Sequence, residues 1–106
     1  MKPVLWKDNK VHMVDQRRLP TEEIWLTYET AVAVADAIKT MVVRGAPAIG
    51  VAAAYGLALE ALTFEGTRDS LLSTLEAKAA ILEATRPTAI NLKWALDRML
   101  RFARKS

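Results

Sequence analysis

The sequence predicts an α+β fold in which a small three-stranded antiparallel sheet is followed by a bundle of about four helices. The first thirty residues contain short runs rich in β-branched and aromatic side chains, which are typical of strands. After residue 30 the apolar residues recur every three or four positions, which is typical of helices. A chain of 106 residues, 52% hydrophobic and 25% charged, has the size and composition of one ordinary domain. We therefore expect residues 1–106 to form a single domain.

Three strands are predicted near the start of the chain: Val4–Trp6, Val11–Val14 and Ile24–Tyr28. Asp8 and Asn9 separate the first two strands, and both residue types tolerate a positive φ and favour turns. We therefore expect a hairpin of the first two strands. The third strand follows the loop that contains Pro20.

The first predicted helix begins after Thr30, which is a suitable N-cap. Its apolar positions are Ala31, Val34, Ala35, Ile38 and either Met41 or Val42. The second helix is expected to have Pro47 as its first helical residue and to be buried on all sides, because Glu60 is its only charge before Leu62. A membrane span is not expected, since this stretch is shorter than the roughly 20 residues required and consists largely of Ala and Gly.

The remaining two helices are separated by a proline. Gly66 is expected to end the second helix in the left-handed conformation, and Thr67 or Asp69 to cap the third helix. The predicted buried positions of the third helix are Leu71, Leu75, Ala79 and Leu82. Pro87 interrupts the pattern, and the last helix is expected from about Thr88 to Ala103. Its predicted buried stripe consists of Leu92, Ala95, Leu96, Met99 and Phe102.

The composition excludes several classes of site. The chain has no cysteine, so it forms no disulfide, no thiolate metal site and no cysteine nucleophile. We expect a cytoplasmic protein, because the first twenty residues lack the apolar run of a signal peptide. The net charge of +3 comes from 15 basic and 12 acidic residues that are intermixed, so no nucleic-acid partner is implied. The sequence also indicates no metal site and no catalytic acid, base or nucleophile.

Two arginines suggest an anion-binding site. Arg44 and Arg86 each lie just before a predicted helix that opens with Pro within three residues. The positive end of the helix dipole disfavours an arginine there unless an anion lies between them. The N–H groups around Gly45 and Ala46 could bind phosphate oxygens, and the arginines could add charge-assisted hydrogen bonds. Alternatively, both side chains extend into water or pair with Asp and Glu, and spacing alone does not decide between these interpretations.

Other conspicuous residues have simpler explanations. The run Asp15–Pro20 could be a docking surface, but a solvated turn is the favoured interpretation. His12 alternates with apolar residues and is expected to be structural rather than catalytic. Trp6, Trp25 and Trp94 are expected in the core or at an interface.

Three blocks of sequence carry a resemblance: Asp15–Pro20, Met41–Gly56 and Arg86–Met99. In this order, they closely resemble the methylthioribose-1-phosphate isomerase family. The resemblance implies an aldose–ketose isomerase of methionine salvage that converts 5-methylthioribose 1-phosphate to 5-methylthioribulose 1-phosphate without a required cofactor. It also implies that the residues that help to bind this sugar-phosphate substrate are Arg44, Gly45, Ala46 and Arg86.

Members of this family continue into a larger Rossmann-like C-terminal domain, which holds the catalytic Cys and Asp and most of the homodimer interface. These roles correspond to no residue of this chain, so the resemblance implies an N-terminal substrate-binding domain that is inactive alone. We expect an apolar patch on the last helix, around Trp94 and Phe102, to be covered by that missing C-terminal domain.

Three alternative functions stay open. Two belong to the same fold family: a regulatory or scaffold module of the translation initiation-factor exchange-complex type, and a domain of the ribose-1,5-bisphosphate isomerase type. The third is a basic helical domain that binds nucleic acid. It predicts binding that weakens steeply with salt and does not depend on Arg44.

Overall fold

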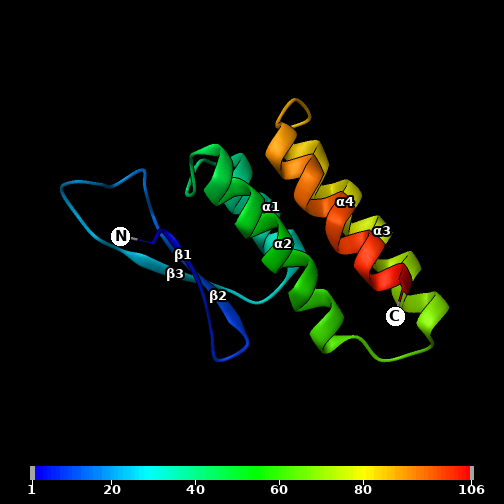
Figure 1. Ribbon diagram of the computed structural model, residues 1–106. Helices are drawn as coiled ribbons and strands as arrows, with labels where there is room; N and C mark the ends of the chain where they lie inside the picture. Colours follow the sequence, from blue (N-terminus) through cyan, green and yellow to red (C-terminus); the bar gives the residue numbers. More distant parts are fainter. Residues whose placement is uncertain (1, 106) are drawn as a thin grey trace.

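The strands form one antiparallel sheet in the order β1 (Val4–Lys7), β2 (Lys10–Val14) and β3 (Trp25–Tyr28). The computed structural model describes residues 2–105. Within them the sheet is followed by four helices: α1 (Ala31–Lys39), α2 (Ala46–Thr63), α3 (Arg68–Thr85) and α4 (Ile90–Lys105). Helix α2 lies between the sheet and the α3–α4 pair (Figure 1). The predicted α+β fold is confirmed.

The hairpin of β1 and β2 forms as predicted. Lys7 pairs with Lys10, and the two residues between them, Asp8 and Asn9, have φ values of 55° and 59°. Two consecutive positive φ values give a tight turn whose twist matches that of the flanking strands. The central strand is β2, which carries the fully buried Val11 and Met13 and contacts α2.

Both predicted threonine N-caps are confirmed. The Thr30 hydroxyl accepts the Ala33 N–H at 3.1 Å at the start of α1, and the Thr67 hydroxyl accepts the Ser70 N–H at 3.1 Å at the start of α3. After α1 the chain turns at Met41, which has a φ of 67°. The predicted buried positions of α3 hold for Leu75, Ala79 and Leu82, and Leu71 is half-buried.

Helix α2 is the central packing element, since it contacts the other three helices and both β1 and β2. It begins at Ala46, before the predicted start at Pro47, and Gly45 is its N-cap. The prediction that α2 is buried on all sides is wrong, because Val51 is 42% exposed and Leu62 is 52% exposed. The neighbouring elements leave one stripe of α2 uncovered.

By length and composition, α2 is apolar and long enough to cross a membrane, and it is the only such helix among residues 2–105. Its contacts with three helices and two strands are those of a helix packed into a protein core.

The end of α2 differs from the prediction. The helix ends at Thr63 with Phe64 as its C-cap, so Gly66 is not a left-handed cap. Gly66 has a φ of 146° in the following loop, where a Cβ would lie 3.0 Å from the Phe64 ring. A glycine is therefore favoured at position 66 because of its positive φ and the close Phe64 ring, and not because it ends α2.

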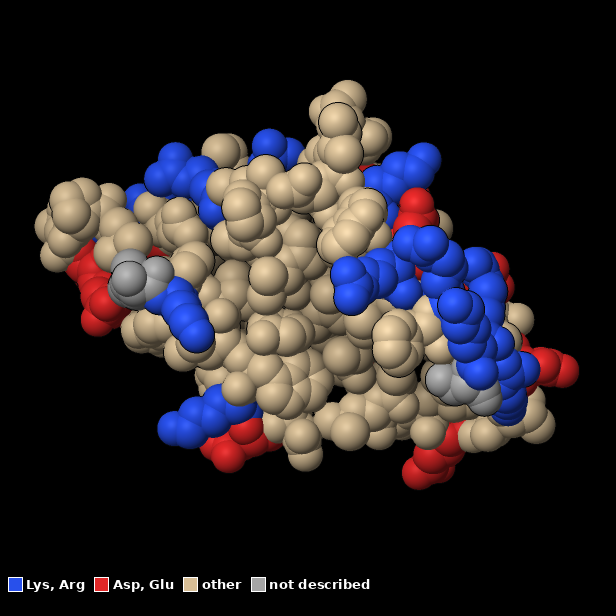
Figure 2. Space-filling view, in the orientation of Figure 1, with Lys and Arg blue, Asp and Glu red and all other residues tan. Residues whose placement is uncertain are grey.

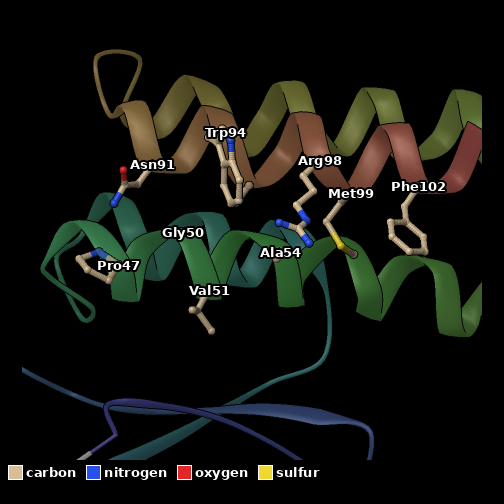
Figure 3. Close-up of a pocket in the computed structure, with 10 residues that line it drawn as sticks. Pro47, Gly50, Val51, Ala54, Asn91, Trp94, Arg98, Met99 and Phe102 are labelled. Atoms are coloured by element: carbon tan, nitrogen blue, oxygen red, sulfur yellow. The ribbon is translucent and has the colours of Figure 1, made fainter.

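The start and the buried face of α4 also need correction. The helix begins at Ile90 rather than Thr88, because the Ala89 N–H donates to the Arg86 carbonyl and closes a turn first. In the predicted stripe, Leu92 and Leu96 are buried, and Ala95 and Met99 are half-buried. Phe102 is 71% exposed, because its ring lies at the open edge between α4 and α2 (Figure 3).

The three tryptophans have different environments. Trp6 packs against the core and against the ring of Tyr55, with 5.5 Å between the ring centroids. Trp25 and Trp94 are 39% and 56% exposed, so neither is a core residue.

Candidate anion-binding site

The N-terminus of α2 has no side chain that caps it. Its N-cap, Gly45, has a φ of 90°, and the first turn contains no acidic residue. The N–H groups of a first helical turn have no partner within the helix, and the dipole makes this end partly positive. A Cβ on Gly45 would meet nothing within 4 Å, so the loop is open to a ligand. This end of α2, with the exposed Gly45 and Ala46, can therefore offer main-chain donors to an anion.

Arg44 lies beside this helix end. Its guanidinium donates to the Gln16 carbonyl at 3.4 Å, and the side chain is exposed. Arg44 and Gly45 line a pocket of about 540 Å³ between the start of β1 and α2. The other lining residues are Lys2, Pro3, Val4, Pro47, Ala48, Val51 and Tyr55. Two cations, Lys2 and Arg44, thus border a pocket that already lies at the positive end of a helix, which favours an anionic ligand.

Reasoning from the sequence missed Lys2 and Tyr55. The packing of β1 against α2 brings both residues to the pocket, and these two elements are far apart in the chain. No local pattern distinguishes Lys2 from other surface lysines.

Arg86 lies elsewhere in the fold. It is the half-buried C-cap of α3, and it does not line the pocket that contains Arg44. Helices α2 and α4 run in the same direction, so the turn before α4 lies at the same end of this helix pair as the Gly45 loop (Figure 3). Within residues 2–105, neither arginine forms an ion pair with a carboxylate. Of the four predicted binding residues, Arg44 and Gly45 therefore line this pocket. Ala46 is exposed at the first position of α2 but does not line the pocket, and Arg86 lies outside it.

A buried charge, Asp15, holds the loop that supports Arg44. Asp15 is 2% exposed, and the Arg17 guanidinium donates to both of its carboxylate oxygens, at 2.9 and 2.8 Å. These hydrogen bonds hold the pKa of Asp15 below its ordinary value, although burial acts in the opposite direction. The next residue, Gln16, donates its N–H to the Val42 carbonyl and accepts from Arg44. The run 15–20 is therefore an ion-paired turn with a structural role.

Replacing Asp15 with asparagine is expected to lower the free energy of unfolding at pH 7 by about 1–2 kcal/mol, because a buried charge-assisted pair is lost. Since folding lowers the pKa of Asp15, its contribution is complete above the ordinary Asp pKa of about 3.9 and is lost as the pH falls through the lower folded-state value. Urea unfolding at pH 7 and in acid should show the difference between the two proteins shrinking below about pH 4.

Glu23→Gln, which alters an exposed carboxylate in the same loop, is the matched control for Asp15→Asn. It is expected to change the free energy of unfolding at pH 7 by less than about 0.5 kcal/mol. A difference between wild type and Asp15→Asn that stays constant into acid would show that the charge of Asp15 contributes nothing.

His12 has the structural environment expected for it. Its Nδ1 lies 3.1 Å from the Thr27 hydroxyl and its Nε2 lies 3.2 Å from the Lys7 carbonyl, so the ring links all three strands. In the part of the chain that the structure describes, no three side chains of His, Asp or Glu gather into a group that could hold a metal ion.

Comparison with known proteins identifies the family. The model of the initiation factor 2 subunit family matches residues 42–106. The chain is 57% identical over 106 residues to the methylthioribose-1-phosphate isomerase of Syntrophotalea carbinolica, and this match covers 99% of the chain and 31% of that protein. It is 51% identical over 105 residues to the protein of the same name from Nostoc sp., and this match covers 98% of the chain and 30% of that protein.

Two solved structures have the same fold. The 5-methylthioribose 1-phosphate isomerase from Pyrococcus horikoshii superposes with a TM-score of 0.93 at 45% identity, covering 98% of this chain and 30% of that one. The translation initiation factor eIF-2B, subunit delta, from A. fulgidus superposes with a TM-score of 0.92 at 38% identity, covering 100% of this chain and 31% of that one.

The chain thus spans less than a third of the length of these relatives. The resemblance to methylthioribose-1-phosphate isomerases that three sequence blocks indicate is confirmed over almost all of its 106 residues. The chain therefore belongs to the initiation factor 2 subunit family.

Proposed function

We propose that this chain is the substrate-binding N-terminal domain of an isomerase that converts 5-methylthioribose 1-phosphate to 5-methylthioribulose 1-phosphate in methionine salvage. The observation that carries the proposal is the uncapped start of α2, where Arg44 and Gly45 line one pocket and no carboxylate among residues 2–105 pairs with Arg44. A sugar phosphate supplies the charge that this helix end favours. The names of relatives at 57% and 51% identity support this substrate class.

The proposed division of roles follows from the groups that each residue offers. Gly45 and Ala46 bind phosphate oxygens through main-chain N–H groups, and Arg44 adds a charge-assisted hydrogen bond. Arg86 contributes a second positive charge from the turn before α4.

The chemical step requires groups that this chain does not supply. The sequence contains no cysteine, and the family resemblance assigns the catalytic Cys and Asp to a C-terminal Rossmann-like domain. We therefore infer that the chain is inactive alone, and that the whole protein is a cytoplasmic homodimer that needs no cofactor. Neither a nucleic acid nor a membrane has a part in this function.

A regulatory module of the initiation-factor type is the second candidate. The TM-score of 0.92 and the 38% identity with the A. fulgidus protein favour it. The two functions differ in turnover. When the chain is joined to a C-terminal domain that carries the catalytic Cys and Asp, an isomerase forms the ketose phosphate, whereas a regulatory module binds the sugar phosphate and leaves it unchanged.

Substitution of Arg44 by alanine is expected to weaken the binding of a pentose 1-phosphate by about 10- to 100-fold, because one charge-assisted hydrogen bond is lost. Arg86→Ala is expected to weaken it in the same direction. The measurement is an amide chemical-shift titration, first with inorganic phosphate and then with the pentose 1-phosphate. In the wild type, we expect shifts centred on Gly45, Ala46 and Ala48.

Arg68→Ala is the matched control for Arg44→Ala. Arg68 also lies at a helix N-terminus, but α3 has the Thr67 cap and an acidic residue, Asp69, in its first turn. This variant is expected to bind as the wild type does. Wild-type affinity in Arg44→Ala, or no shifts in the wild type at saturating ligand, would contradict a phosphate site preformed in this chain.

A further inference from the structure

A second cavity runs between α2 and α4 as an apolar groove of about 620 Å³ (Figure 3). Three small residues, Gly50, Ala54 and Ala95, line it and leave it hollow. Larger side chains from α4 also line it, and among them Trp94 is 56% exposed and Phe102 is 71% exposed. Exposed apolar surface of this kind marks an interaction site more often than ordinary protein surface does.

One end of the groove is strongly basic. Arg98, Arg101 and Lys105 line an adjoining hollow together with Phe102, and Figure 2 shows Lys and Arg side chains gathered on one side of the molecule. Within residues 2–105, none of these three cations pairs with an Asp or Glu side chain, whereas the neighbouring Arg104 lies 3.1 Å from Glu76. Arg98 lies over the Trp94 ring, 5.3 Å from its centroid, so this cation contacts an aromatic side chain of the groove. Cations without a carboxylate partner beside an apolar groove favour a partner that combines apolar side chains with carboxylates.

The dimensions of the groove fit a helix. The residues of α4 that line it extend from Asn91 to Phe102, which corresponds to about 16 Å, or three turns of a helix. An amphipathic helix can place apolar anchors at positions i, i+4 and i+7 over this length.

We propose that this groove is the docking site for a carboxylate-bearing amphipathic helix that belongs to the remainder of the longer polypeptide found in the relatives. The chain covers only 31% of the S. carbinolica protein, so such a remainder is large. A helix docked here would also border the anion pocket, because Pro47 and Val51 line both cavities. This is the arrangement of a substrate site formed between two domains, and in this respect the inference rests on the proposed function.

The test uses the 106-residue chain and overlapping peptides that cover the part of the S. carbinolica protein outside the matched region. We expect at least one acidic amphipathic peptide to bind and to shift the amides of Gly50, Ala54 and Ala95. Val51→Glu and Arg101→Glu are each expected to weaken that binding at least tenfold. Both side chains are exposed, so amide spectra should show that the variants fold.

Ile81→Glu is the matched control for Val51→Glu, because Ile81 on α3 is also 42% exposed and does not line the groove. It should bind the peptide as the wild type does. Arg44→Ala should also leave peptide binding unchanged, which separates the failure of this proposal from the failure of phosphate binding.

Three results would overturn the docking proposal. The first is that no peptide from the relative binds. The second is equal binding to the wild type, Val51→Glu and Arg101→Glu. The third is dimerisation of the chain in sedimentation equilibrium that Val51→Glu abolishes, since this would assign the groove to a second copy.

Discussion

Leu82→Ala is expected to lower the free energy of unfolding by about 3–5 kcal/mol, since it removes a fully buried side chain and leaves a cavity. Leu82 lies on α3 where α1 and α2 meet it. Its Cδ1 would be 3.5 Å from a Cβ on Gly56, and that same Cβ would be 3.4 Å from Val34. Three packed helices therefore enclose the cavity, and they cannot move together far enough to fill it. The loss is a large part of the roughly 5–15 kcal/mol that stabilises a typical domain.

Urea unfolding followed by far-ultraviolet circular dichroism measures this loss. The matched control is Leu62→Ala, because Leu62 is 52% exposed, and its change is expected to stay below about 1 kcal/mol. Gly56→Ala should stabilise the Leu82→Ala protein more than it stabilises the wild type, since its methyl group enters the cavity that the missing Leu82 side chain leaves. A loss below about 1 kcal/mol for Leu82→Ala would mean that α1, α2 and α3 are not closely packed there.

The parts of the fold that local chemistry determines could be predicted from the sequence. The turn at Asp8 and Asn9 and the caps at Thr30 and Thr67 depend only on residues close in the chain, and all of them form as expected. The same holds for the grouping of Arg44 with Gly45 at the start of α2. Their binding of phosphate stays a prediction.

The parts that depend on distant contacts could not be predicted. An apolar helix such as α2 shows no periodicity that marks which side its neighbours leave open, so the exposure of Val51 was not foreseen. Lys2 enters the anion pocket only because β1 packs on α2. Asp15 appears in the sequence as part of a polar turn, and its burial depends on the surrounding fold.

Gly50→Val is expected to lower the free energy of unfolding by about 3 kcal/mol and to change the candidate site as well. A Cβ at Gly50 would lie 3.3 Å from the Asn91 carbonyl oxygen and 3.8 Å from the Ala95 Cβ. The first of these atoms belongs to the backbone of α4 and cannot rotate away as a side chain can. The two further methyl groups of valine must therefore push the N-terminal turn of α4 away from α2.

That displacement has a functional consequence, because the turn that Arg86 begins leads into α4, and Arg44 lies just before the N-cap of α2. If close packing at Gly50 fixes the distance between the two arginines, Gly50→Val should weaken pentose 1-phosphate binding about as much as Arg86→Ala does, although both arginines are present. The titration should be repeated with Ala54→Val, which adds the same side chain to α2 beside the open groove and is expected to change stability by less than about 1 kcal/mol. Wild-type affinity in a folded Gly50→Val protein would show that the α2–α4 contact does not set the position of Arg86, and that Arg44 and the start of α2 bind the phosphate without it.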